Sequence, residues 1–227
     1  MNLLAASLGT LTSLRSLNMV SAGIDDSRAQ ILSSGLMNCT LSRLDIHNNN
    51  FGPAGMRAIA RAIPYCQSLR SLNIGGNDIG IEGSRALIEA VLNSNLESVD
   101  FWKIYDPYAA AMTLFVESLG KFTQLRSLKL SGYASVHVRP LLDGLRKNHS
   151  LLAIYPPTAE INRALLVNQT ICAWKEHRRI YYDEKILNFI RAMHVRNNDA
   201  MKYITDRLPW ELTDFIIEQF LIELKQR

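Results

Sequence analysis

A repeating unit of about 28 residues constrains this chain more than any other feature of its sequence. Leucine-containing segments begin at Leu14, Leu41, Leu69, Leu96 and Leu125 and, in degenerate form, at Leu151, so that successive units start 27, 28, 27, 29 and 26 residues apart. A single amphipathic helix would repeat its apolar positions every three or four residues. The long period therefore predicts two elements in each unit, one extended and one helical, which stack as a solenoid.

The clearest unit spans residues 69–95 and reads LRSLNIGGNDIGIEGSRALIEAVLNSN. Its first half places apolar side chains at Leu69, Leu72 and Ile74, and its second half changes to helical spacing. The pattern LxxLxLxxNxIGxxG before an apolar helix resembles the ribonuclease-inhibitor-type leucine-rich repeat family, which includes intracellular receptors, actin-capping proteins and Ran GTPase-activating proteins. The resemblance implies an α/β fold, a right-handed horseshoe with parallel inner strands and outer helices.

Two regions follow from where the repeat holds and where it fades. Residues 1–159 are predicted to form a solenoid of five to six repeats, the first incomplete because Leu3, Leu4 and Leu8 read as the end of a helix without its strand. Residues 160–227 read as amphipathic helices and are predicted to form a helical C-terminal cap. Within the solenoid we expect helices at 29–36, 56–63, 84–92, 109–119 and 138–145.

Asparagines and glycines recur where each predicted strand ends. Asn49 and Asn77 hold the ninth place of their units, where an amide can bond neighbouring backbone groups and form a ladder between repeats. Gly52, Gly55, Gly80 and Gly83 are expected in the turn that leads into the helix, because glycine allows close backbone approach there.

Composition favours an intracellular protein. The 227 residues carry a formal charge of +4 and are 48% hydrophobic, with no apolar run long enough for a membrane helix and no convincing signal peptide. Cys39, Cys66 and Cys172 form no CxxC pair and are expected to be buried free thiols. We therefore expect a cytoplasmic location, with the nucleus as the alternative, and a monomer or part of a longer chain.

Alternation along each strand predicts which side chains face away from the helices. His47, Gly75 and Trp102 should lie side by side in one row, with Gly75 and Gly76 forming a notch between a histidine and an indole. Two interpretations remain open at this point. Trp102 is either exposed beside the notch, as a binding hot spot would be, or folded over the glycines so that it fills the notch.

The sequence favours a non-catalytic protein-protein interaction scaffold that binds its partner through the concave strand face. Five strands about 4.8 Å apart offer on the order of 400 Å², about half of one partner's share of a standard interface, so the loop after the fourth strand should contribute. That loop departs most from the repeat pattern. The predicted partner-binding residues are Asp45, His47, Asn73, Gly75, Asp100, Trp102, Lys103, Tyr105, Tyr108 and Lys129.

No catalytic residue, cofactor site or metal site is predicted. The chain has no phosphate-binding loop, GxSxG or HExxH motif, and its histidines lack the spacing of metal ligands. The partner is expected to be a protein of unknown identity, without involvement of a membrane. Nucleic acid is disfavoured because the strand face lacks a field of one sign.

Two alternatives remain. Basic residues interleaved with aromatic ones in the C-terminal helices could bind nucleic acid or another anionic ligand. The basic residues concerned are Lys175, Arg178, Arg179, Lys185, Arg191, Arg196 and Lys202. A GTPase-activating role rests on the resemblance of the scaffold alone, because no motif carries that family's functional residues onto this chain.

Overall fold

Each leucine-containing segment forms a short strand that pairs in parallel with the strand of the next repeat. The computed structural model describes residues 1–102, 110–130, 138–148 and 150–155, together with Ile161, Asn162, Ala164, Leu165, Asn168 and Gln169. The chain divides into two units, Met1–Leu165 and Leu166–Arg227, and the fold below is that of the first. The predicted boundary between residues 159 and 160 stays a prediction, as does the helical cap.

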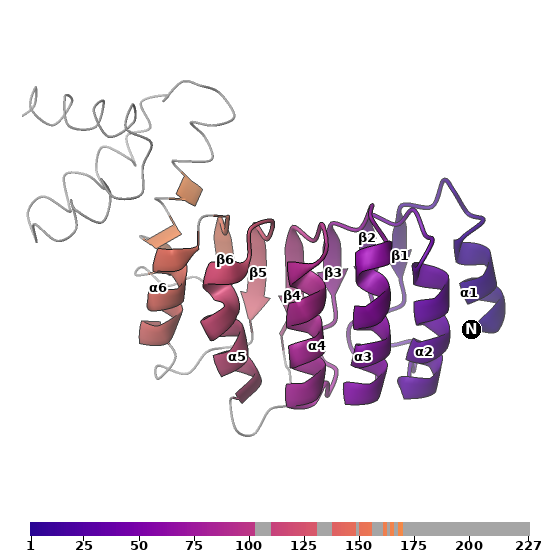
Figure 1. The fold of residues 1–227 in the computed structure, drawn as a ribbon. Helices are drawn as coiled ribbons and strands as arrows, with labels where there is room; N and C mark the ends of the chain where they lie inside the picture. Colours follow the sequence, from indigo (N-terminus) through magenta and orange to yellow (C-terminus); the bar gives the residue numbers. More distant parts are fainter. Residues whose placement is uncertain are drawn as a thin grey trace, which may run out of the picture. The chain divides into compact units, whose positions relative to one another are not determined.

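The strands follow one another across the sheet in sequence order, from β1 to β6 (Figure 1). They are β1 Ser16–Asn18, β2 Arg43–Asp45, β3 Ser71–Asn73, β4 Ser98–Phe101, β5 Ser127–Leu130 and β6 Ala153–Tyr155. The register joins equivalent positions of the repeats, for example Leu44 with Leu72 and Leu72 with Val99. Parallel neighbouring strands need a crossover element in each connection, and the helix of each repeat provides it. The observed pairing therefore confirms the predicted α/β solenoid with parallel strands.

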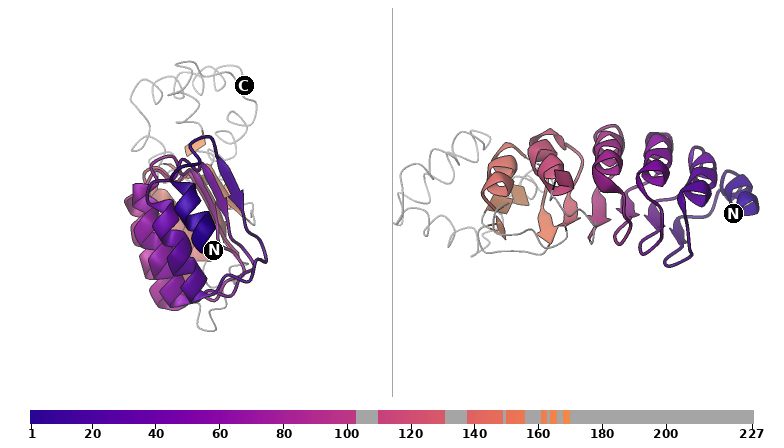
Figure 2. Two further views of the ribbon diagram at one scale, coloured as in Figure 1. Left: turned by 90° about the vertical axis from the view of Figure 1, so that its right-hand side faces the viewer. Right: turned by 90° about the horizontal axis from the view of Figure 1, so that it is seen from below.

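Helices form the second layer and cover one side of the sheet (Figure 2). They are α1 Asn2–Leu8, α2 Asp26–Leu36, α3 Pro53–Ala62, α4 Gly80–Leu92, α5 Ala110–Ser118 and α6 Val138–Lys147, with the short 3-10 helices η1 Ile63–Tyr65 and η2 Leu119–Lys121. The core lies between the layers as one continuous cluster. Its fully buried members include Leu44, Leu72 and Phe101 from the strands, Ile46 and Ile74 directly after them, and Leu32, Met56, Ile59, Leu87 and Phe115 from the helices.

The observed helices α2, α3 and α4 begin three or four residues before the predicted starts. The prediction used the first apolar residue, whereas the helix starts at its capping turn. Asp25 caps α2 by accepting a hydrogen bond from the Arg28 N–H at 2.8 Å, and Pro53 opens α3. Gly55 and Gly83 are consequently helical and do not lie in a turn as predicted.

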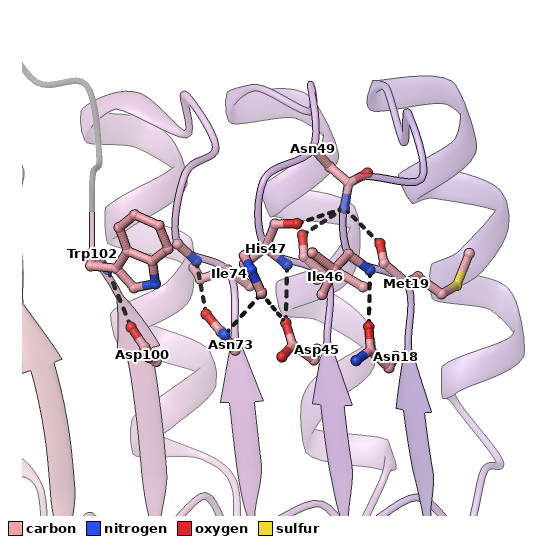
Figure 3. A network of polar contacts seen from close by, with 12 residues as sticks. Asn18, Met19, Asp45, Ile46, His47, Asn49, Asn73, Ile74, Asp100 and Trp102 are labelled. Atoms are coloured by element: carbon pink, nitrogen blue, oxygen red, sulfur yellow. Dashed lines mark hydrogen bonds and ion pairs between the residues drawn. The ribbon is translucent and has the colours of Figure 1, made fainter.

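The asparagine ladder is confirmed in the part of the chain that the structure describes. The Asn49 amide nitrogen donates to the carbonyls of Met19 and Ile46 at 2.9 and 2.8 Å (Figure 3). Its oxygen accepts the Ile24 N–H at 2.9 Å, and the Asn77 oxygen accepts the Asn49 N–H at 3.1 Å. Each side chain therefore satisfies buried backbone groups of its own repeat and of the preceding one.

Cys39 and Cys66 are buried free thiols, as predicted, and Cys172 lies outside the described residues. The Cys66 thiol donates to the Cys39 carbonyl at 3.5 Å. Its hydrogen bond with the Cys39 side chain, and after it burial, raises the pKa of Cys66 above the ordinary value of 9.0.

Candidate functional site

One side of the sheet faces away from the helices (Figure 2). Its residues are half-buried or exposed, apart from the buried Gly75, and we call this side the strand face. On β2 to β6 these side chains alternate with buried ones, as in the pattern intermediate–buried–intermediate of β3. The strand face consists of Ser16, Asn18, Val20, Arg43, Asp45, His47, Ser71, Asn73, Gly75, Ser98, Asp100, Trp102, Ser127, Lys129, Ala153 and Tyr155.

Four Asn or Asp side chains on this face accept a hydrogen bond from the backbone N–H two residues later. The acceptors are Asn18, Asp45, Asn73 and Asp100, at 3.1, 3.2, 3.2 and 3.5 Å respectively. Such local bonds hold the chain as it leaves each strand. The sequence analysis missed this row, although the signal was present as Asn or Asp at the fifth place of four consecutive units.

Asp45, His47 and Asn73 form a connected polar group in the middle of the strand face. His47 Nδ1 lies 2.6 Å from Asp45 Oδ1 and 3.1 Å from Asn73 Nδ2 (Figure 3). The shorter contact is that of a ring N–H donating to a carboxylate, since two acceptors would repel each other at this distance. The His47 ring is thereby fixed with its other nitrogen turned away from Asp45.

Trp102 fills the place predicted to be an open notch. A Cβ on Gly75 would lie 2.6 Å from both Cδ1 and Nε1 of the indole and 2.9 Å from the Trp102 carbonyl oxygen. The interpretation with an exposed tryptophan beside a notch is therefore wrong. Gly76 adopts a φ of +70° beside the Asn48 side chain, and its N–H donates to the Trp102 carbonyl at 2.7 Å.

The outer side of the indole remains half-buried and is flanked by a cation and an imidazole. Lys129 Nζ lies 5.7 Å from the ring centroid and 3.0 Å from Asp100 Oδ2, while the His47 ring centroid is 5.9 Å from that of Trp102 at an angle of 50°. The ion pair contributes at most about 1 kcal/mol because Lys129 is exposed. Its main effect is to hold the ammonium group near the indole face.

Seven of the ten predicted binding residues thus lie on four neighbouring strands or one or two residues after them, namely Asp45, His47, Asn73, Gly75, Asp100, Trp102 and Lys129. The other three, Lys103, Tyr105 and Tyr108, lie outside the described residues. Tyr155 was missed. It is 48% exposed and pairs in register with Lys129, so it extends the aromatic part of the strand face onto β6.

Within the described ranges no three His, Cys, Asp or Glu side chains gather as metal ligands would. No helix of that part has the length and apolar character needed to cross a bilayer. The basic C-terminal residues named for anionic ligands lie outside it.

Comparisons with known proteins bear on the fold. A family model described as Leucine Rich repeat matches residues 38–60 and 65–87. Comparison with curated proteins finds no match. Among solved structures, the chain is similar to one described as leiomodin-1 actin-binding site 2, with 14% identity over 77% of this chain and 92% of that chain and a TM-score of 0.50.

It is also similar to the C-terminal domain of tropomodulin from Caenorhabditis elegans, with 13% identity over 77% of this chain and 96% of that chain and a TM-score of 0.52. At such low identity the likeness concerns the fold alone, and the ribonuclease-inhibitor subtype stays a prediction. The strands of the two matched units pair in the same six-stranded sheet as the strands of the other repeats. The chain therefore contains leucine-rich repeats and has the α/β solenoid fold that such repeats form.

Proposed function

We propose that this protein is a non-catalytic interaction scaffold whose protein partner binds the strand face around Trp102, together with the following loop that holds Lys103, Tyr105 and Tyr108. The proposal rests on the ordered position of the Trp102 indole. The ring packs against Gly75 and is flanked by Lys129 and His47. A large aromatic side chain that is already ordered loses little conformational entropy on binding, which suits a hot spot.

The non-catalytic part of the proposal rests on the surroundings of His47. Its bond to Asp45 resembles the oriented base of a catalytic dyad, but a nucleophile must also lie within hydrogen-bond reach of the imidazole. Among the described residues the ring donates to Asp45 through Nδ1, which also lies 3.1 Å from Asn73 Nδ2, and its aromatic neighbour is Trp102. The group is therefore suited to recognising a polar group of a partner rather than to activating a nucleophile.

The loop belongs to the proposal because the strands alone provide little area. Six strands about 4.8 Å apart extend over about 24 Å between the outermost strands, and five residues of each span about 16 Å. The product is on the order of 400 Å², whereas one partner contributes about 800 Å² to a standard interface.

Affinity capture from a lysate of the source organism tests the proposal, with immobilised wild type, Trp102→Ala and Leu92→Ala. Leu92 provides the matched control because it is an apolar side chain on α4 that is 39% exposed. We expect a protein retained by wild type and Leu92→Ala, with an affinity for Trp102→Ala at least about 30-fold lower. Equal retention by Trp102→Ala would contradict the proposal.

Filamentous actin is one defined partner for the same comparison by co-sedimentation, because the similar leiomodin domain is described as an actin-binding site. If actin is the partner, wild type and Leu92→Ala sediment with it and Trp102→Ala stays in the supernatant. If wild type also stays in the supernatant, actin is not the partner. The same variants are then compared for binding to the protein captured from the lysate.

A further inference from the structure

A second part of the sheet is basic, separate from Trp102, and none of its residues is among the predicted binding set. Arg15, Arg43 and Arg70 lie on three successive repeats where the strands β1, β2 and β3 begin, and we call them the arginine strip. The Arg43 N–H donates to the Arg15 carbonyl at 3.0 Å, and the Arg70 N–H donates to the Ser42 carbonyl at 2.9 Å. These bonds place the three residues on adjacent chain segments, so the strip extends over about two strand spacings, or about 10 Å.

Two of the guanidinium groups are held by the same local arrangement. Arg15 Nη1 donates to the carbonyls of Thr12 and Leu14 at 2.6 and 3.3 Å. Arg70 Nη1 donates to the carbonyls of Gln67 and Leu69 at 2.7 and 3.1 Å. A guanidinium has five N–H donors, so most remain for a ligand while the side chain is already ordered.

The strip carries an excess of positive charge towards β1. Arg70 Nε lies 3.4 Å from Glu97 Oε1, whereas Arg15 and Arg43 form no ion pair with a carboxylate among the described residues. The nearest acid along β2, Asp45, is bonded to His47. Both Arg15 and Arg43 are exposed, and Arg43 lies in register between Ser16 and Ser71, whose hydroxyl groups add further donors.

We propose that the arginine strip binds a short acidic segment of a protein partner, whose carboxylates are bonded by Arg15 and Arg43 while its neighbouring residues extend over the strand face. This inference rests on the proposed function and adds the chemistry of one part of the partner. Carboxylates on alternate residues of an extended chain are about 6.6 Å apart, which fits within the strip. Paired Arg–carboxylate bonds are strong and orient the chain that carries them.

A peptide fits this surface better than a nucleic acid does. A phosphate chain would carry regularly spaced charges past the strip, where Asp45 and Asp100 would repel it, and Glu97 would repel it beside Arg70. A peptide can place two carboxylates at Arg15 and Arg43 and neutral residues elsewhere. The mixed charge of the face therefore favours discrete carboxylates.

Fluorescence anisotropy with the full chain tests the inference. The probe is a labelled, N-acetylated peptide Gly-Glu-Gly-Glu-Gly-Glu-Gly, and its matched control replaces each Glu by Gln. We expect the Glu peptide to bind at low salt, the Gln peptide to bind at least about tenfold more weakly, and the affinity for the Glu peptide to fall between 50 and 200 mM NaCl.

Two double variants with the same change in charge locate the site. Arg15→Glu with Arg43→Glu should weaken binding at least about tenfold, and Arg57→Glu with Arg61→Glu, exposed on α3, should change it less than about threefold. Arg15→Lys with Arg43→Lys keeps the charge but loses the planar fork, and should lie between the two. Circular dichroism verifies that each variant is folded.

Trp102→Ala should retain the peptide within about threefold, so this measurement is independent of the test of Trp102. The inference is overturned if wild type does not bind the Glu peptide, or if both Glu double variants weaken binding equally. It is also overturned if a single-stranded oligodeoxythymidylate of equal charge binds more tightly and displaces the peptide.

Discussion

The Trp102 indole occupies the space that a side chain at Gly75 would need, since Cδ1 and Nε1 would both lie 2.6 Å from a Cβ built on that glycine. Two residues from adjoining repeats, 27 positions apart, thus form one unit. The glycine is required by the neighbouring strand, because only a residue without a side chain leaves room for the ring. The indole in turn covers Gly75, which is buried although most residues of the strand face are half-buried or exposed.

We expect Gly75→Ala to displace the indole and to lower the free energy of unfolding by about 1–3 kcal/mol, as overpacking does elsewhere. Urea titration followed by circular dichroism measures the loss, and tryptophan fluorescence reports the displacement. Gly9→Ala is the control, because the nearest atom to a Cβ there is the Asn38 Cβ at 3.9 Å. Similar losses in both variants would show that the indole does not restrict Gly75.

The asparagine ladder should contribute more than any single exposed contact. Asn77→Ala removes hydrogen bonds to the Ile46 and Ile74 carbonyls at 3.1 and 2.8 Å and leaves the buried Asn49 N–H without its acceptor. We expect a loss of about 3 kcal/mol in urea unfolding. Asn50→Ala, at an exposed asparagine that follows Asn49 in the preceding repeat, should cost less than about 0.5 kcal/mol. Equal costs would contradict the ladder.

Helix α3 receives its N-terminal cap from the preceding repeat. Asp26 Oδ1 accepts the N–H groups of Gly52 and Gly55, each at 2.7 Å, while the N-cap residue Gly52 has no side chain to do so. Asp26→Ala should therefore lower the unfolding free energy by about 1 kcal/mol. The same substitution at Asp78, an exposed residue without such a bond, should be nearly neutral. A neutral Asp26→Ala would show that water replaces the cap.

The hydrogen bond with the Cys39 side chain and, after it, burial raise the pKa of Cys66 above its ordinary value of 9.0, which predicts that stability depends on pH above that value. Because the pKa is raised in the folded state, the thiol ionises first in the unfolded chain when the pH exceeds 9.0. Its contribution to the free energy of unfolding is complete below that pH and is lost as the pH rises. The same hydrogen bond lowers the pKa of Cys39 to about 7, so the reference is the double variant Cys39→Ala with Cys66→Ala, which removes both thiols. Compared with this variant, wild type should lose up to about 1.4 kcal/mol per pH unit above pH 9. Urea titrations at pH 8, 9 and 10 measure the difference, and parallel pH profiles would contradict it.

The sequence predicted the strands, their order and the core, because a period of about 28 residues with leucines at fixed places allows one register only. Leu44, Leu72 and Val99 meet as expected. The starts of the helices could not be read from apolar spacing alone, because the first turn is set by caps such as Asp25 and by the cap that Asp26 supplies to α3.

The register set by the repeat also explains what the sequence did not predict at the candidate site. The repeat fixes which Cα atoms adjoin, so it placed Gly75 beside Trp102, but it does not fix the rotamer that carries the ring over the glycine. Tyr155 was overlooked because its repeat is degenerate, although its register with Lys129 places it on the strand face.

Hydroxyl-radical footprinting with mass spectrometry tests most directly whether partners bind the strand face. The protein is labelled alone and with the protein that it captures, and oxidation of Trp102 and Tyr155 is compared with that of Tyr65 in η1, which is 65% exposed. We predict that the partner reduces oxidation of Trp102 and Tyr155 several-fold and leaves Tyr65 unchanged. Protection of Tyr65 with unchanged oxidation of Trp102 would contradict the account.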